Sequence, residues 1–168
     1  MSGKLIGIVL VVLGAAAGVG MYYLQVYHFY DRLDPGAVAL TVEEAGALRA
    51  LEAGSLSAID ATSSPIRFRA CFELTGEVAG DPYPGAVPLN APGWFDCFDA
   101  AAIGADLESG TAIAVTGQRN IVYGIDRVLA IYPDGRGFAW HQINACGEEV
   151  FDGRPAPEGC PPPPEGNS

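Results

Sequence analysis

The chain has 168 residues and a net charge of −11 at pH 7. Its first thirty residues contain no acid, so residues 31–168 carry all 20 acidic residues against eight arginines and no lysine, a net charge of −12. Phosphate backbones repel such a surface, which excludes nucleic-acid binding, whereas basic proteins or cations suit it as partners. The same acidity also serves simply to keep a domain soluble. The length beyond residue 30 fits one domain with its own hydrophobic core.

An uncharged apolar stretch near the N-terminus runs from Leu5 to Leu24. Its twenty residues would rise about 30 Å as a helix, which matches the hydrocarbon core of a bilayer and predicts a transmembrane helix. Lys4 precedes the stretch, whereas the charges that follow, in residues 31–34, are net negative. By the positive-inside rule we expect a single-pass protein of the cytoplasmic (inner) membrane, with its N-terminus inside and its C-terminal domain in the periplasm.

A cleaved signal peptide is the alternative interpretation of this segment. Lys4, an apolar run and then Ala15-Ala16-Ala17 before Gly18 are typical of a cleavage region. The chain nevertheless stays apolar and aromatic for about a dozen residues beyond that point, as expected at a lipid–water boundary. We therefore favour a retained anchor, and both interpretations place the rest of the chain outside the cytoplasm.

Small residues form a stripe along the predicted membrane helix. Gly3, Gly7, Gly14 and Gly18 fall close to one face, and the last two form a GxxxG pattern. Such a stripe lets a second helix approach closely, so we predict lateral packing with another copy or with a larger membrane subunit. The competing explanation is composition, because glycine is frequent in membrane helices.

The first element expected after a linker over residues 31–39 is a helix from Val42 to Ala53. Thr41 and Glu44 have the spacing of a capping box, apolar residues recur at helical spacing, and Gly54 can end the element. Two glutamates at the start of a helix explain the sequence TVEEA without an acidic site.

The next segments are predicted to be a turn, a strand and a long connection. Residues 55–64 are small and polar, with only Leu56 and Ile59 expected in the core. Ile66–Leu74 alternates as in a half-buried strand and places Cys71 on the more polar face. Gly76–Gly93 is rich in glycine and proline, and long loops of this kind are often functional.

The second half of the chain predicts one helix followed by strands. Asp99 caps a helix over Ala100–Ser109, and Gly110 ends it. Strands follow at 111–116, 121–123 and 127–132. The turn PDGRG at 133–137 makes Val128–Ile143 a β-hairpin.

Together these elements predict an α+β fold. We expect a cytoplasmic N-terminus and transmembrane anchor over 1–30, the linker, and an exported domain over 40–151. That domain contains an antiparallel sheet of four to five strands and two helices. The proline-rich tail, 152–168, is expected to be extended.

All four cysteines, Cys71, Cys97, Cys146 and Cys160, lie in the exported part, where disulfides form. No C-x-x-C pair is present, so neither a zinc site nor a covalent haem is predicted. Of the three possible pairings we expect Cys71 with Cys97 and Cys146 with Cys160, because the second pair would hold a tail that has no other means of docking.

No catalytic, cofactor or metal site is predicted. His28 lies among boundary aromatics, and His141 lies in a strand with no nucleophile placed beside it by the sequence. Capping explains Asp96 and Asp99 better than a carboxylate pair, and Asp126-Arg127 is interpreted as a local ion pair. No hydrolase, P-loop, zinc-protease or dinucleotide motif occurs, so the sequence does not predict an enzyme.

The cysteine contexts are distinctive: they read FRACFEL, GWFDCFDA, INACGEEVFDG and EGCPPPP. Together with the N-terminal span, they resemble a family of small single-span bacterial envelope proteins of unknown function. Proteins of this kind sometimes carry a histidine-kinase label, which the sequence does not support, because it has neither a Gly-rich ATP lid nor room for a kinase core. The resemblance implies a topology and no activity.

The expected function follows from the anchor and the acidic domain. We expect a membrane-anchored extracytoplasmic protein that acts through protein–protein contacts, as an accessory or assembly component of a membrane complex. The alternative is an extracytoplasmic ligand-binding or sensing module that uses Gly76–Gly93 as the lip of its site.

Overall fold

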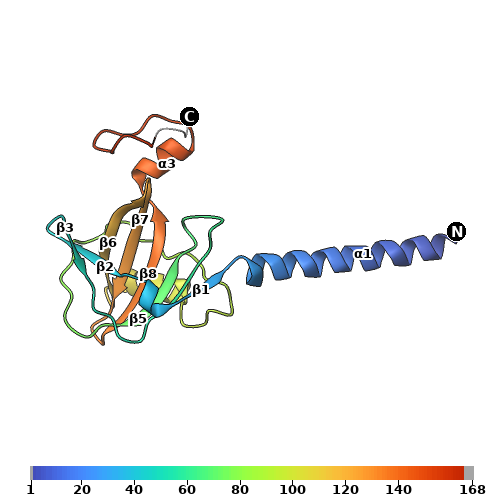
Figure 1. Cartoon of the computed structure of the whole chain (residues 1–168), viewed down its shortest axis with the longest axis horizontal. Coiled ribbons are helices and arrows are strands. Elements are labelled where there is room, and N and C mark those ends of the chain that lie inside the picture. The colour runs from blue at the N-terminus through green and yellow to red at the C-terminus, as the bar shows by residue number, and fades with distance from the viewer. Residues whose placement is uncertain (1, 165–168) are drawn as a thin grey trace.

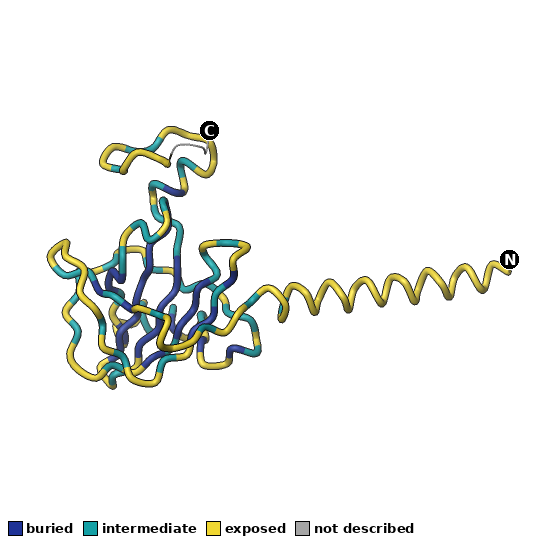
Figure 2. Tube along the Cα trace, viewed as in Figure 1, coloured by how far each residue is buried: buried dark blue, intermediate teal, exposed yellow. Residues whose placement is uncertain are grey.

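The computed structural model describes residues 2–164, so the last four residues of the predicted tail lie outside it. A long helix, α1 (Gly3–Tyr23), continues through a π-helical turn, η1 (Leu24–His28), and projects away from the rest of the chain (Figure 1). None of its residues is buried (Figure 2). The 26-residue helix is long and apolar enough to cross a membrane, which confirms the predicted N-terminal apolar helix.

The domain is built on a larger antiparallel sheet than predicted. Six strands lie in the order β1-β4-β5-β8-β7-β6. Their bounds are β1 Asp31–Leu33, β4 Ser57–Asp60, β5 Arg69–Glu73, β6 Ile113–Val122, β7 Ile125–Ile131 and β8 Arg136–Ile143. A separate two-stranded sheet contains β2 (Thr41–Glu44) and β3 (Ala47–Ala50). The α+β class is confirmed, whereas the count of four to five strands was too low.

The predicted helix over Val42–Ala53 is wrong, because this segment forms the β2–β3 hairpin. Ala45 and Gly46 both have positive φ, as a two-residue hairpin turn requires. The Asp81 carboxylate accepts hydrogen bonds from both of their backbone N–H groups, at 2.9 and 3.1 Å, which lowers the pKa of that carboxyl. A partner 36 residues away therefore stabilises the turn and overrides the local capping signal.

Other elements differ from the prediction in segments whose sequence pattern for helix or strand is weak. The expected linker contains β1 and the 3₁₀ turn η2 (Pro35–Ala37), and the expected turn over residues 55–64 contains β4. One bulged strand, β6, replaces two short ones. A short helix, α3 (Ala145–Phe151), was not predicted and is capped by the Asn144 side chain.

Elements with strong local signals are confirmed: α2 has the predicted bounds, and the β7–β8 hairpin forms as predicted but begins earlier, at Ile125. Helix α2 spans Ala100–Ser109, with the Asp99 carboxylate accepting from the first backbone N–H groups and Gly110 in the left-handed region at φ 76°. Strands β7 and β8 form the predicted hairpin, joined by the turn after Ile131.

Hydrophobic clusters lie on both faces of the six-stranded sheet. The β2–β3 hairpin covers one face, where Leu40 and Val42 pack against residues such as Phe72 and Leu129. Helix α2 and the connection before it cover the other face, around Trp140 and Phe138. Burial on both faces explains why β5, predicted to be half-buried, contains the buried Arg69.

Two disulfides join Cys71 to Cys97 and Cys146 to Cys160, which is the predicted pairing. The first ties β5 to the loop that precedes α2. The second ties α3 to the proline-rich tail. The two bonds use all four cysteines, so no free thiol is present among the described residues.

Candidate functional site

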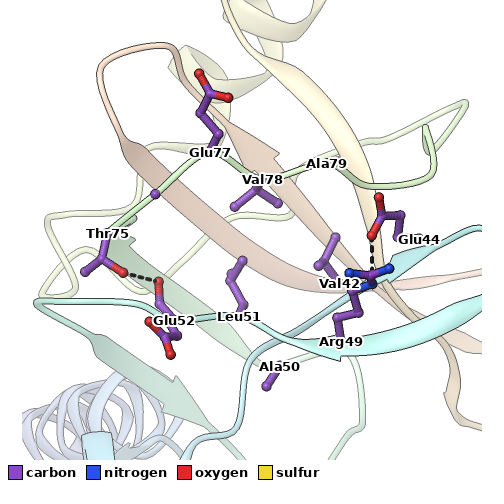
Figure 3. Close-up of a pocket in the computed structure, with 11 residues that line it drawn as sticks. Val42, Glu44, Arg49, Ala50, Leu51, Glu52, Thr75, Glu77, Val78 and Ala79 are labelled. Atoms are coloured by element: carbon purple, nitrogen blue, oxygen red, sulfur yellow. Dashed lines mark hydrogen bonds and ion pairs between the residues drawn. The ribbon is translucent and has the colours of Figure 1, made fainter.

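An open cavity of about 430 Å³ lies between the β2–β3 hairpin and the chain that follows β5, and we call it the slot. We call residues 76–79 the strap. Val42, Arg49 and Leu51 line one side of the slot, and the strap forms the other side (Figure 3). The slot lies on the side of the domain opposite the projecting helix α1 (Figure 1).

The strap is fixed at its two ends and free between them. Before it, Thr75 donates to the Glu52 carbonyl through its hydroxyl, at 3.2 Å. After it, Asp81 donates its backbone N–H to the Glu43 carbonyl, at 2.7 Å, and accepts from the Thr116 backbone N–H. Within the described chain, no hydrogen bond engages residues 76–80. The strap's backbone donors and acceptors are therefore available at the slot.

The outer edge of β3 provides a second row of free backbone groups. Val42 pairs with Arg49, and the Leu51 backbone N–H donates to the Leu40 carbonyl at 2.9 Å. Hydrogen-bonded and non-hydrogen-bonded pairs alternate in an antiparallel ladder, so Leu48 and Ala50 point their backbone groups away from β2. Among residues 2–164, neither of these outward groups has a hydrogen-bond partner. All four residues of β3 are exposed.

Acidic side chains surround the slot. Glu44 forms an ion pair with Arg49 at 2.7 Å, which uses the only cation among the lining residues. Glu52 and Glu77 lie on opposite walls (Figure 3), and neither is in an ion pair within the described residues. In Figure 3 both carboxyl groups point away from the gap between Leu51 and Val78, so these two carboxylates lie at the rim of the slot.

A larger cavity, of about 770 Å³, adjoins the other side of the strap. The strap residues from Gly76 to Val78 line both cavities. Apolar residues of β6 and β7, Ile113 and Ile131, contribute to its wall, together with the β7–β8 turn. The first few residues of the predicted Gly76–Gly93 loop thus border two cavities, and residues 83–88 of the same loop line a third, of about 320 Å³, against α2.

The rest of this loop is pinned to the sheet. Gln142 contacts it twice, accepting from the Val87 backbone N–H at 2.8 Å and donating to the Gly85 carbonyl at 2.9 Å. Buried Arg69 donates to the Leu89 and Asn90 carbonyls, and burial lowers its pKa to about 10, so it remains charged at pH 7. These bonds fix this part of the predicted ligand lip against the sheet, whereas the strap has no such bonds among the described residues.

A second feature joins the domain to the anchor. The Trp94 indole Nε1 donates to the Val26 carbonyl at 2.6 Å, and the Trp94 ring packs edge-on against Tyr30. The Arg32 guanidinium lies 4.8 Å from the Trp94 ring centroid, and that of Arg67 lies 5.3 Å from the Tyr30 ring centroid. Tyr30, one of the aromatics that follow the apolar stretch, thus packs against Trp94, the residue that joins the domain to the helix end.

His141 lies in a buried polar cluster. Its Nε2 accepts from Arg127 Nε at 3.2 Å, its Nδ1 lies 2.7 Å from the Pro65 carbonyl oxygen, and its ring stacks on Phe68. Burial lowers the pKa of His141 to about 4, so the ring is neutral at pH 7. Both ring nitrogens are occupied, and the cluster ties β7 and β8 to residues near Pro65.

A second buried network surrounds Asp126. The Asp126 carboxylate accepts from the Asn144 side chain at 2.6 Å, from the Asn120 backbone N–H at 2.8 Å and from the Tyr83 hydroxyl at 3.1 Å. Asp126 is thus held by neutral donors, and the expected ion pair with Arg127 is not among the ion pairs of the described residues. The network attaches α3 to the β6–β7 turn.

The remaining residues considered in the sequence lie away from the slot and from one another. His28 ends η1, Asp99 caps α2, and Gly7, Gly14 and Gly18 lie exposed on α1 with open space at their Cα positions. Residues 2–164 contain no group of three or more His, Cys, Asp or Glu residues placed to hold a metal ion. Sequence reasoning missed the slot, because no local pattern connects residues 42–52 with residues 75–79.

A family of unknown function, DUF6446, matches residues 38–161, which is more than half of the chain. The chain therefore belongs to this family. The match begins after the anchor and includes both disulfides and the slot. Searches of curated proteins and of solved structures give no significant match.

Proposed function

We propose that this DUF6446 member is anchored by α1 in the cytoplasmic membrane and acts in the periplasm through contacts with other envelope proteins. In this proposal it is an accessory or assembly component of a membrane complex. Two disulfides support an oxidising compartment for the domain. The net charge of −12 beyond residue 30 suits basic partners.

One observation carries the proposal: the bond from Trp94 Nε1 to the Val26 carbonyl, at 2.6 Å, which docks the domain on its anchor. The last turns of a helix leave carbonyl groups without helical partners, and Trp94 satisfies one of them. A domain docked in this way presents one fixed side away from the membrane. That side carries the slot and the open edge of β3 (Figure 1).

Lateral contacts of α1 form part of this proposal. Gly7, Gly14 and Gly18 leave α1 without side-chain bulk along one stripe, and no other part of the described chain covers them. Close helix packing in a bilayer depends on such small residues. We propose that a second membrane helix packs there.

A ligand-binding or sensing module is the second candidate. The strap separates cavities of about 430 and 770 Å³, which are within the range of small-molecule sites, about 300–1,000 Å³. This alternative requires a bound small molecule instead of a partner protein.

Purification of the tagged full-length protein in mild detergent distinguishes the two candidates. The proposal predicts reproducible co-purifying membrane or envelope proteins, and solitary behaviour with a bound small molecule would favour the second. A reporter fused after Ser168 tests the location. It should be active only if it is a reporter that works outside the cytoplasm, and activity of a cytoplasmic reporter would contradict the proposal.

A further inference from the structure

Two stretches of backbone beside the slot have no hydrogen-bond partners among the described residues. Ala50, which lines the slot, and Leu48, two residues earlier on the same edge, point their N–H and C=O groups outward from β3, and the other stretch is the strap. The two sides meet at one end, where Thr75 bonds to the Glu52 carbonyl. An extended chain placed between them would find partners on both sides, as in strand addition to a sheet edge.

The edge of β3 is short, at four residues, but it has no proline and no bulge, and its register with β2 is continuous over four pairs. Its one charged side chain, Arg49, is held by Glu44. The edge at β6 is partly covered, because residues near Pro82 pair with it at Val115. The edge of β3 beside the slot has no such cover among the described residues.

The charge of the slot selects the kind of segment. Glu52 and Glu77 lie at opposite margins of the slot (Figure 3) and have no ion-pair partner among the described residues, so a lysine or arginine of the entering segment that reaches the rim would compensate them. Acidic segments would be repelled.

Two other occupants fit less well. A second copy would bring an equally acidic face to the edge, and like charges oppose that contact. The chain's own tail is proline-rich and so lacks N–H donors, and the Cys146–Cys160 disulfide holds it to α3, which projects from another end of the sheet (Figure 1).

We propose that the slot binds an extended, basic segment of a partner protein, which pairs with β3 as an added strand and lies against the strap. This inference rests on the proposed function, because the segment belongs to the partner. It names the site of contact and the chemistry of the partner.

The probe is a library of random ten-residue peptides, selected in parallel on the full-length protein and on Leu48→Pro, both in nanodiscs. Proline at position 48 removes an outward N–H and leaves the bonds to β2 in place, whereas Leu48→Ala keeps the N–H and is the matched control. We expect peptides rich in lysine and arginine that bind the wild type and Leu48→Ala about tenfold more tightly than Leu48→Pro.

Further variants test the charge and the backbone pairing. Glu52→Gln and Glu77→Gln should each weaken binding up to about fivefold, whereas Glu158→Gln, the same charge change in the tail, should have no effect. Bound peptide should slow hydrogen exchange of the Leu48 and Ala50 amides. Alternate N–H groups of an added strand point toward β3, so N-methylation of one alternate set of peptide nitrogens should abolish binding, and methylation of the other set should not. This test changes only the peptide and does not depend on the folding of any protein variant.

Several outcomes would overturn the inference. These are peptides that bind Leu48→Pro equally well, a lack of any enrichment over empty nanodiscs, or a dimer of this chain that Leu48→Pro dissociates. The proposed function fails separately. If partners still co-purify with Leu48→Pro and Glu52→Gln, the protein contacts stand and the slot is not their site. If no partner co-purifies with the wild type, the proposed function itself is contradicted.

Discussion

Trp94 and Val26 are 68 residues apart in the chain, yet the Trp94 indole donates a 2.6 Å hydrogen bond to the Val26 carbonyl. This bond connects the loop before α2 to the last turn of the apolar helix. Because Trp94 also packs against Tyr30 and lies beside Arg32, the helix end and the domain share one small cluster. We expect the orientation of the domain relative to α1 to depend on this cluster.

Trp94→Phe should loosen the connection without disturbing the sheet. Phenylalanine keeps an aromatic ring but removes the N–H donor, which should cost about 1 kcal/mol. Distances measured by double electron–electron resonance, between labels at positions 21 and 122, should broaden in the variant. Labels attached through non-cysteine residues leave the disulfides intact. Unchanged distance distributions would show that the bond does not set the orientation.

Protonation of His141 should destabilise the domain as the pH falls. Its pKa is lowered to about 4 in the folded protein, chiefly by burial, from an ordinary value of 6.5. The contribution of neutral His141 to the free energy of unfolding is therefore complete above pH 6.5. It decreases by about 3 kcal/mol as the pH falls toward 4. Denaturant unfolding at a series of pH values should show this decrease.

His141→Asn provides the control for this pH dependence. The asparagine amide can still donate toward the Pro65 carbonyl but does not titrate. The variant should be less stable at pH 7 and should lack the loss between pH 6.5 and 4. An unchanged pH profile in the variant would assign the loss to other groups.

Removal of the Cys146–Cys160 disulfide should release the tail. The bond closes a loop of 14 residues, and the chain-entropy estimate gives a loss of about 3 kcal/mol in the free energy of unfolding. Limited proteolysis of the Cys146→Ser, Cys160→Ser variant should cut after Phe151, while the sheet stays protected. Protection of the tail equal to that of the wild type would show that α3 holds it without the bond.

Several elements could be predicted because their signals are local. Asp99 and Gly110 mark both ends of α2, and the turn before Arg136 sets the β7–β8 hairpin. The β2–β3 hairpin could not be predicted, because the Asp81 carboxylate that stabilises its turn comes from elsewhere in the chain. The buried Arg69 likewise depends on carbonyls about twenty residues away.

The site was less predictable than the fold. The Gly76–Gly93 loop was identified as a possible lip, but the hydrogen bonds that pin most of it come from Arg69 and Gln142 on the sheet. The strap, which has no such bonds among the described residues, lines two cavities, and residues 83–88 line a third. The open edge of β3 has no sequence signal at all, since the segment has a stronger local pattern for a helix.

Bulk at the glycine stripe should weaken lateral association of the anchor. Gly14→Leu and Gly18→Leu place large side chains where a second helix would pack, whereas Val11→Leu, expected off the centre of the stripe, should change little. A membrane-association assay of the full-length protein compares the three variants. Equal association of all of them would mean that the stripe reflects composition, and that the domain supplies any contacts.

Photocrosslinking in cells tests the central claim most directly. Benzoylphenylalanine at position 79 places a reactive group on the strap and leaves Glu52 and Glu77 in place, and the same residue at position 158 provides a control on the tail. The account predicts a discrete crosslinked product between this chain and another envelope protein from position 79 that position 158 does not give. Irradiation at position 79 that yields no crosslinked protein, or only the product seen from position 158, would contradict it.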